Sequence, residues 1–226
     1  MPAIYRIIRR KFVRLPFGNW QKTPTHRPQA LSAYAMQSDL KVTFNNIRSL
    51  EDTQHLLNAG TLSQCAGLLV TCRTILLFGM GSSLCVAKDT YLKFLRMNKP
   101  CIVNEDWHSQ LLQAKNSSSE DAAFIFSYGG QTKEMIECMK ILKKNGTPCI
   151  AVTRYALSSI AKLADYCLYT AANETLFRNG AMSSRLSQLN VVDILYTGFA
   201  FLQHDYAVKQ LVHTHIQKEN ADSGEP

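Results

Sequence analysis

The sequence predicts an α/β fold in which helices cover both faces of a parallel sheet. Five short runs of residues are apolar at almost every position, and a segment with helical periodicity follows each of them. Strands that are apolar on both sides are typical of parallel sheets, which are buried on both faces. The chain has 226 residues, 46% of them hydrophobic and 19% charged, which suits one globular domain with a sizeable core.

The predicted strands and helices alternate from residue 73 to about residue 203. The strands are Arg73–Phe78, Cys101–Val103, Ala122–Phe126, Cys149–Thr153 and Tyr166–Thr170. The helices are Ser82–Met97, a segment through Leu111 and Leu112, Gln131–Asn145, Ser158–Leu163 and Ala181 to about Gln203. Gly79 follows the first strand and Gly146 ends the third helix. Upstream, the apolar spacing between Leu50 and Thr71 predicts helices with a break near Gly60.

The last helix is apolar over more than one face. One stripe is formed by Met182, Leu186, Leu189, Val192, Tyr196 and Phe199, and further apolar residues spread beyond it. A helix that is apolar nearly all round is buried on two sides. It is either a central core helix or a helix that packs on the core with one side and on a second copy with the other. We favour the second interpretation, which predicts a homodimer or a higher homo-oligomer.

Two predicted strands end in turns rich in glycine and hydroxyl groups. Gly79–Ser83 follows the first strand and Ser127–Thr132 follows the third. Each turn alone is explained by a tight bend with a capping hydroxyl. Ligands of parallel sheets, however, bind beyond the carboxyl ends of the strands, where helix N-termini attract anions. Two such turns at one edge of a sheet therefore favour a site for a phosphate group.

Other ligand classes have less support in the sequence. The GMGSS turn lacks the third glycine of a dinucleotide fingerprint, because that position is Leu84, and no Walker A ending is present. We therefore expect no cofactor. The seven cysteines show no CxxC spacing and are interpreted as buried side chains in a reducing, cytoplasmic compartment. His213 and His215 have no third ligand nearby, so no metal is expected. No apolar run is long enough to span a membrane.

Positive charge is concentrated at the start of the chain. Residues 1–41 hold eight basic residues and one acid, so they carry +7 of the chain's net charge of +8. We divide the chain into a basic arm and linker at 1–42, a domain at 43–205 and a polar C-terminal tail at 206–226. The arm is either a solvated charged segment or a surface for an anionic partner such as DNA.

From about Thr43 to Phe201, the chain resembles the sugar isomerase (SIS) domain of RpiR-type transcription regulators. The matching segments, in family order, are FGMGSSLCVAKDTYLKFLRM, NEDWHSQ, FSYGGQTKEMIECMKILKKNGTPCIAVT, SSIAKLADYCLYT and FRNGAMSSRLSQLNVVDILY. The resemblance implies a flavodoxin-like three-layer fold with a five-stranded parallel sheet. It also implies that the domain binds a phosphorylated sugar or amino sugar at the two turns and dimerises.

The resemblance assigns ligand contacts to both turns and to one residue between them. The implied ligand-binding residues are Ser82, Ser83, His108, Ser127, Gly129, Gln131, Thr132 and Lys133. The family's second turn reads Ser-x-Ser-Gly-x-Thr, whereas this chain has Gly129 at the second serine. A hydrogen bond to a charged group is worth about 1.5–3 kcal/mol, so the loss of this hydroxyl predicts weaker binding or a different preferred ligand.

The arm itself is similar to the recognition helix of the RpiR-type helix-turn-helix domain. The matching stretch is AIYRIIRRKFVRLPFGNWQK, and the helices that precede it in the family have no counterpart in this sequence. An amphipathic basic helix explains the stretch equally well. The DNA-contacting residues expected from the match are Arg6, Arg9, Arg10, Lys11 and Arg14. Without a bracing helix, we expect weak DNA binding with little sequence preference.

Three functions compete at this point. The leading hypothesis is a phosphosugar sensor whose ligand controls DNA-binding transcriptional regulation. The alternative is a sugar-phosphate aldose–ketose isomerase, which needs a base near the carbon-bound proton. Glu105, His108 and Glu174 are candidates for that base, but none is paired with a recognisable acid, so we expect no catalytic residue. A third possibility is a fragment that assembles only with partner subunits.

Overall fold

The protein is described here from a computed structural model that covers residues 28–172 and 181–216, with side chains from residue 41 onward. Val42 and the residues that follow it form one compact unit, which is described by itself. The predicted DNA-contacting residues of the arm lie outside the described residues, and so does Glu174. The predicted boundaries of the arm, the domain and the tail stay predictions.

The predicted α/β fold is confirmed: the unit contains a five-stranded parallel sheet in the order β2-β1-β3-β4-β5. The strands are β1 (Ile75–Gly79), β2 (Cys101–Val103), β3 (Ala122–Phe126), β4 (Cys149–Arg154) and β5 (Tyr166–Thr170). Each lies within two residues of its predicted position. The direction of the strand order reverses between β1 and β3, because β2 lies on one side of β1 and β3 to β5 on the other.

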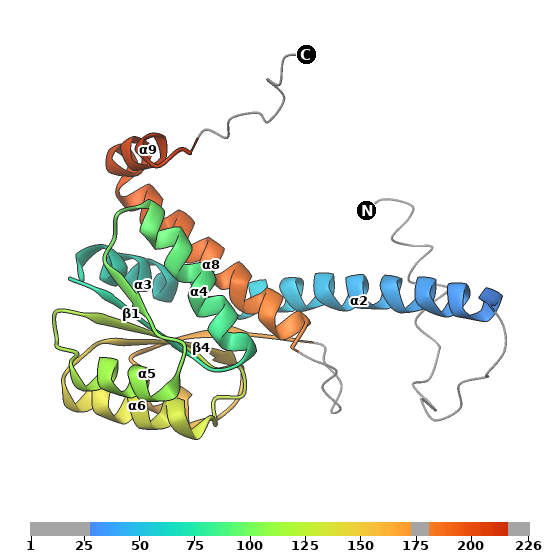
Figure 1. Cartoon of the computed structure of the whole chain (residues 1–226), viewed down its shortest axis with the longest axis horizontal. Helices are drawn as coiled ribbons and strands as arrows, with labels where there is room; N and C mark the ends of the chain where they lie inside the picture. The colour runs from blue at the N-terminus through green and yellow to red at the C-terminus, as the bar shows by residue number, and fades with distance from the viewer. Residues whose placement is uncertain (1–27, 173–180, 217–226) are drawn as a thin grey trace, which may run out of the picture. The chain divides into compact units, whose positions relative to one another are not determined.

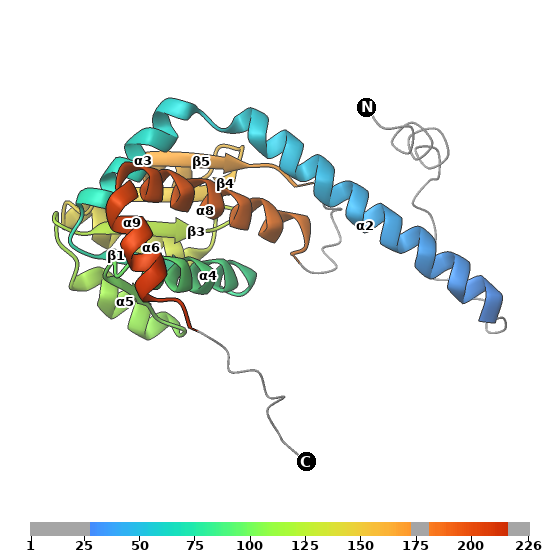
Figure 2. The same cartoon turned by 90° about the horizontal axis from the view of Figure 1, so that it is seen from above.

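Helices cover both faces of this sheet (Figure 1). The helices are α2 (Pro28–Leu56), α3 (Ala59–Thr71), α4 (Ser82–Arg96), α5 (Trp107–Lys115), α6 (Lys133–Lys144), α7 (Ser159–Leu163), α8 (Ser183–Leu202) and α9 (His204–His213). Helices α3, α4 and α8 lie on one face, and α5 and α6 on the other (Figure 1). Helix α8 packs over β4 and β5, and α9 follows it directly (Figure 2).

Alternating strand residues supply two hydrophobic cores, one on each face of the sheet. In β1, Ile75 and Leu77 face the core under α3, α4 and α8, while Leu76 and Phe78 face the core under α5 and α6. All five residues of β1 are buried, as are all five of β3. The two-residue period of a strand therefore explains why an uninterrupted apolar run is needed here.

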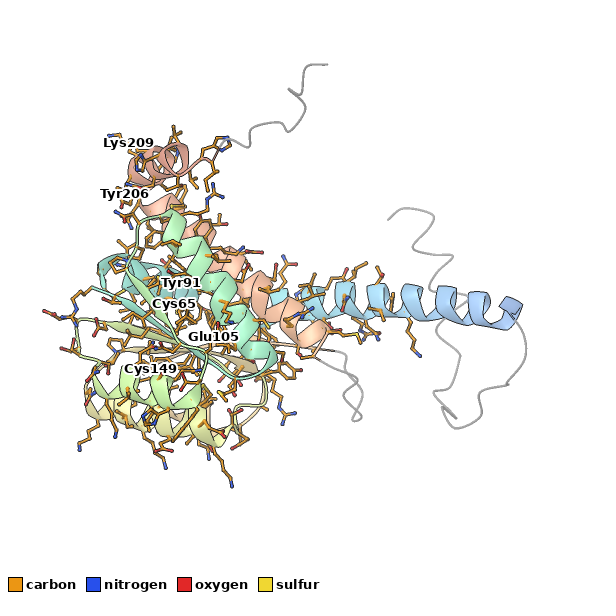
Figure 3. All side chains as sticks on the ribbon, in the orientation of Figure 1. Cys65, Tyr91, Glu105, Cys149, Tyr206 and Lys209 are labelled. Atoms are coloured by element: carbon orange, nitrogen blue, oxygen red, sulfur yellow. The ribbon has the colours of Figure 1, made fainter. Side chains whose placement is uncertain are left out.

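The cysteines of the described residues are all free, and most of them are buried. Figure 3 labels Cys65 and Cys149, which lie in the two opposite cores. Burial raises the pKa of both thiols to about 12, so both stay protonated at neutral pH and pack as small apolar side chains. Among the described residues, no helix is both long and apolar enough to cross a bilayer, and no cluster suited to a metal ion is found.

Helix α8 carries both core residues and exposed apolar residues. Val192 and Phe199 are buried, and Phe199 packs edge-on against Phe94 with ring centroids 5.1 Å apart. Near its C-terminus, Phe201 is 79% exposed and Leu202 is 53% exposed. The part of α8 that packs on the sheet agrees with a core helix, whereas its contact with a second copy stays a prediction.

Two helices extend beyond the predicted elements. Helix α2 begins at Pro28, well before the helical pattern that starts at Leu50. Proline suits the first turn of a helix, because the amide hydrogen that it lacks would have no intrahelical partner there. Helix α9 lies mostly within the predicted polar tail, and among its residues Ala207 is buried.

Candidate anion-binding site

The two predicted turns lie side by side because β1 and β3 are neighbours in the sheet. Their last residues, Gly79 and Phe126, are register partners, so both strands end at the same level. A cavity of about 100 Å³ lies beyond these ends. It is lined by Met80, Ser82, Ser83, Phe126, Ser127, Tyr128, Gly129, Thr132, Ser184 and Gln188. This position is where the strand order reverses, the usual place for a ligand in an open α/β sheet.

Three helices begin at this cavity. Ser82 and Ser83 open α4, Thr132 is the residue before α6, and Ser184 lies in the first turn of α8. Each helix start carries a partial positive charge of about half an elementary charge and amide groups without intrahelical partners. Their meeting at one cavity favours a positive potential there, and the described lining adds no charged side chain.

The three helices that begin at the cavity differ from three other helices of the domain in how their first turns are capped. Helix α3 is capped by Asn58, α5 by Asp106 and α7 by Ser158, each accepting a hydrogen bond from a first-turn amide. Within the described part of the chain, α4, α6 and α8 start without a side-chain cap, although Thr132 occupies the capping position of α6. Helix α9 also starts without one. A capped tight turn therefore does not explain Thr132, and an anion in the cavity could take the place of the missing caps.

The hydroxyl groups of the second turn are close together. The Ser127 Oγ and the Thr132 Oγ1 lie 3.3 Å apart, and either can donate to the other. Ser127 is buried and Thr132 is half-buried. Both hydroxyls can rotate their hydrogens toward a ligand, so a phosphate group would meet two donors here in addition to the start of α6.

Contacts with β4 and α7 hold the second turn in place. The Tyr128 carbonyl accepts a hydrogen bond from the Arg154 amide at 2.9 Å, and the Gly130 carbonyl accepts one from the Ile160 amide at 3.2 Å. Gly130 has a φ of +64°, and a Cβ atom there would lie 2.2 Å from the Ser158 Oγ. Gly130 is therefore required both by its backbone conformation and by its close approach to α7.

The first turn depends on a close approach of α4 to β1. A Cβ atom on Gly79 would lie 2.8 Å from the Ser83 carbonyl oxygen. Buried Gln110 of α5 fixes the same glycine from the other face. Its Oε1 accepts a hydrogen bond from the Gly79 amide at 3.1 Å, and its Nε2 donates one to the Gly79 carbonyl at 3.0 Å. These contacts place Ser82 and Ser83 directly beyond the end of β1.

Five of the residues assigned to the ligand line the cavity, and three do not. Ser82, Ser83, Ser127, Gly129 and Thr132 are brought together as expected. Gln131 turns toward α7, where its Oε1 accepts a hydrogen bond from the Ser159 Oγ at 2.9 Å. Lys133 and His108 are exposed and do not belong to the lining. The ligand contacts assigned to all eight residues stay predictions, and for Gln131, Lys133 and His108 the lining of the cavity gives no support.

Sequence reasoning missed Ser184 and Gln188 of α8. Both are buried, at 1% and 2% exposure, and both line the cavity. The apolar residues of α8 dominate its sequence pattern. A usable signal was present, because polar residues four positions apart in an otherwise apolar helix share one face and need a polar environment.

The described lining offers no carboxylate and no imidazole. Glu105, a candidate base, lies outside it and pairs with Lys88 of α4, with Oε1 and Nζ 2.7 Å apart. Figure 3 shows Glu105 beside α4. The side chains that line the cavity in the described ranges can donate and accept hydrogen bonds but are poorly suited to abstract a carbon-bound proton.

A larger cavity, of about 330 Å³, lies beside the edge strand β2 and α5. Several of its polar side chains pair with one another or with the backbone. The Arg73 Nη2 donates to the Asp121 Oδ2 at 3.0 Å, and the Gln113 Nε2 donates to the Ile102 carbonyl at 3.2 Å. Since Asp121 also adds negative charge, this cavity suits an anion less well than the smaller one does.

Substitutions of the adjacent glycines 129 and 130 test how the second turn is positioned. Gly130→Ala should lower the melting temperature by several degrees, because alanine is strained at a φ of +64° and meets Ser158. Gly129→Ala is the matched control: a Cβ atom there meets nothing within 4 Å. Its melting temperature should stay within about a degree of the wild type. Equal melting temperatures for the two variants would contradict this account of the turn.

Comparison with known proteins places this geometry in a family. Residues 68–198, more than half of the chain, match the SIS domain. An uncharacterised HTH-type transcriptional regulator of Caldanaerobacter subterraneus subsp. tengcongensis is 38% identical over 174 residues, which are 77% of this chain and 62% of that protein. The HTH-type transcriptional regulator RpiR of Escherichia coli is 29% identical over 174 residues, which are 76% of this chain and 59% of that protein.

A solved structure agrees with these relatives. The Vibrio vulnificus NanR protein, complexed with ManNAc-6P, is 26% identical and superimposes with a TM-score of 0.74. The similarity covers 82% of this chain and 71% of NanR. The chain spans about three-fifths of the length of the two sequence relatives.

Proposed function

The chain belongs to the SIS domain family and has relatives among RpiR-type regulators, and from this premise we propose that it is a phosphosugar sensor. In this proposal, the domain binds a phosphorylated sugar or amino sugar, and the bound ligand controls transcription through a DNA-binding segment. The observation that carries the proposal is the meeting of three uncapped helix starts at one hydroxyl-lined cavity. NanR, solved with ManNAc-6P, supports a sugar phosphate as the ligand class.

The phosphate group is assigned to the second turn. Thr132 and Ser127 supply hydroxyl donors at the start of α6, where the helix dipole favours negative charge. The cavity, of about 100 Å³, lies directly beside these hydroxyl groups. The hydroxyl that the family carries at position 129 would also fit, because the space beside Gly129 is open and its φ is not positive.

Replacing Thr132 tests the phosphate assignment. A ligand at a hundred times its dissociation constant adds about 2.7 kcal/mol to the free energy of unfolding, a shift that thermal denaturation detects. Thr132→Val keeps the shape and removes a donor, so the ligand's affinity should fall by about 10- to 100-fold. A panel of hexose, pentose and amino-sugar phosphates, including ManNAc-6P, supplies the probes.

Thr197→Val serves as the control, since Thr197 is exposed on α8 away from the cavity. It should keep the full ligand-induced shift. A wild-type protein that no phosphosugar stabilises would contradict the proposed function. A Thr132→Val variant that responds like the wild type would contradict the placement of the phosphate.

We propose that α8 links the cavity to α2. Its first turns have two polar sides: Ser184 and Gln188 line the cavity, while Ser183 and Ser187 face away from it. The Ser183 Oγ donates to the Asn46 Oδ1 of α2 at 2.9 Å. The Ser187 Oγ donates at 2.8 Å to the carbonyl of Ala171, whose amide donates to the Thr53 Oγ1 of α2 at 3.0 Å.

These hydrogen bonds form a route by which a ligand in the cavity can act on α2. A ligand that shifts the start of α8 would alter the contacts of α8 with α2, which begins at Pro28 and follows the basic arm in the sequence. Coupling of this kind requires that the ligand favours one of two arrangements of the linked elements. The route therefore supports regulation by a bound ligand rather than ligand storage alone.

DNA binding by the basic arm is tested by its dependence on salt. The full chain should bind unrelated duplexes with dissociation constants of about 10⁻⁴ to 10⁻⁶ M at physiological salt, weakening steeply as salt rises. The double substitution Arg9→Gln and Arg10→Gln should weaken binding to all duplexes and reduce the salt slope. Tight, salt-resistant binding to a single sequence would instead show a complete sequence-specific reader.

We also propose that the bound phosphosugar is not isomerised. The absence of a carboxylate or imidazole among the described lining residues favours binding without turnover, and the relatives named above are transcriptional regulators. NMR in heavy water should detect no protein-dependent exchange at C1 or C2 of a bound phosphosugar. Exchange that disappears in His108→Ala or Glu105→Gln would favour the isomerase alternative, because one fold supports both functions.

A further inference from the structure

A buried amide nitrogen without a partner faces the cavity. Gln188 of α8 is only 2% exposed and belongs to the lining. Its Oε1 accepts a hydrogen bond from the Ser83 Oγ at 3.4 Å, but its Nε2 has no hydrogen-bond partner among the described residues. If the amide were turned over, its oxygen would be left without a partner in the same place. One polar atom of this side chain is therefore unsatisfied in either orientation.

Gln110 of α5 is a buried glutamine with a structural role, and it differs from Gln188 in its hydrogen bonds. It is fully buried, and both polar ends of its amide pair with the backbone of Gly79. A buried donor without a partner lowers the stability of the folded state, so native proteins rarely keep one without a reason. A ligand that fills the cavity would supply the partner that Gln188 lacks.

We propose that Gln188 is a specificity-determining residue that donates a hydrogen bond from Nε2 to a neutral oxygen of the sugar. The proposal rests on the proposed function and adds the group that distinguishes one sugar from another. The phosphate is assigned to the start of α6, whereas Gln188 lies in the second turn of α8 against Ser83 of α4. A neutral amide at that place matches a ring hydroxyl or an acetamido carbonyl.

A hydrogen bond from the Gln188 Nε2 to a sugar oxygen discriminates between sugars, because a sugar without that oxygen binds with lower affinity. A sugar that lacks an acceptor at that position would leave the amide unsatisfied while also excluding water from it. Discrimination of this kind is stronger than that of an apolar pocket, which tolerates small changes in shape. The ligand class is therefore a phosphosugar with an oxygen acceptor on the part of the ring that reaches α8.

Gln188→Met provides the first test, because methionine keeps the length of the side chain and removes both polar atoms. Without ligand, the variant should melt close to the wild-type temperature, because removal of the unsatisfied donor offsets loss of the long 3.4 Å hydrogen bond from Ser83. The affinity for a phosphosugar that binds the wild type should fall about tenfold, the equivalent of one hydrogen bond. Affinity for inorganic phosphate, measured by competition, should not change.

Gln110→Met is the matched control for a structural role. It breaks two hydrogen bonds to the Gly79 backbone, so it should lower the melting temperature of the unliganded protein. A fall of the melting temperature in Gln188→Met as large as that in Gln110→Met would show that Gln188 is structural and would overturn the proposal. An equal loss of phosphate and phosphosugar affinity would overturn it too, because Gln188 would then contact the phosphate.

Pairs of sugars that differ by one oxygen give the second test. Glucose 6-phosphate is compared with its deoxy analogues, each of which lacks one hydroxyl group, by isothermal titration calorimetry. For one position, removal of the oxygen should weaken binding to the wild type about tenfold and leave binding to Gln188→Met unchanged. Losses that are the same in both proteins at every position would contradict the proposal.

A shape-preserving variant covers the case in which methionine disturbs packing. Gln188→Glu keeps the acceptor for Ser83 and replaces the donor by a second acceptor, so it should weaken phosphosugar binding further than Gln188→Met does. Undiminished binding by this variant would overturn the role of Gln188. If no phosphosugar or phosphate binds the wild type, the proposed function itself is wrong. If a phosphosugar binds the wild type and the Gln188 variants equally well, only the role of Gln188 is wrong.

Discussion

The parallel pairing of β1 with β3 is the constraint on which the rest of the site depends. Their register aligns Gly79 with Phe126, so two chain segments separated by nearly fifty residues end at one level. Because each strand runs directly into a turn and a helix, the starts of α4 and α6 meet there. A shift of the register by one residue would place core residues in the wrong layer, so burial of both cores also fixes the site.

The candidate site offers backbone geometry where many anion sites use charged side chains. In the described lining, hydroxyl and amide groups surround a cavity at which three helices begin without side-chain caps. An anion that binds there satisfies helix starts and needs no buried lysine or arginine. This arrangement leaves the amide of Gln188, whose Nε2 has no hydrogen-bond partner among the described residues, to distinguish one sugar from another. Helix α8 also contacts α2, so in the proposed function one helix both contacts the ligand and connects it to α2.

Much of this architecture follows from sequence patterns, and the remainder depends on tertiary packing. The five strands and the two turns are readable because each strand must be apolar on both sides and each turn needs glycine and hydroxyl groups. Gln188 was not found, because the apolar residues around it obscured two polar positions on one face of α8. The direction of the Gln131 side chain could not be predicted either, since Ser159 of α7, distant in sequence, binds it. Helix α9 lacked a signal because its pattern resembles that of a polar tail.

A crystal structure with a bound phosphosugar is the most direct test of the central claim, that the ends of β1 and β3 form a phosphosugar site. We predict that the phosphate oxygens accept hydrogen bonds from the hydroxyls of Ser127 and Thr132 at the start of α6. The sugar should then lie between Ser83 and Gln188. Electron density for the ligand at the larger cavity beside β2, or at any position away from the three helix starts, would contradict this account.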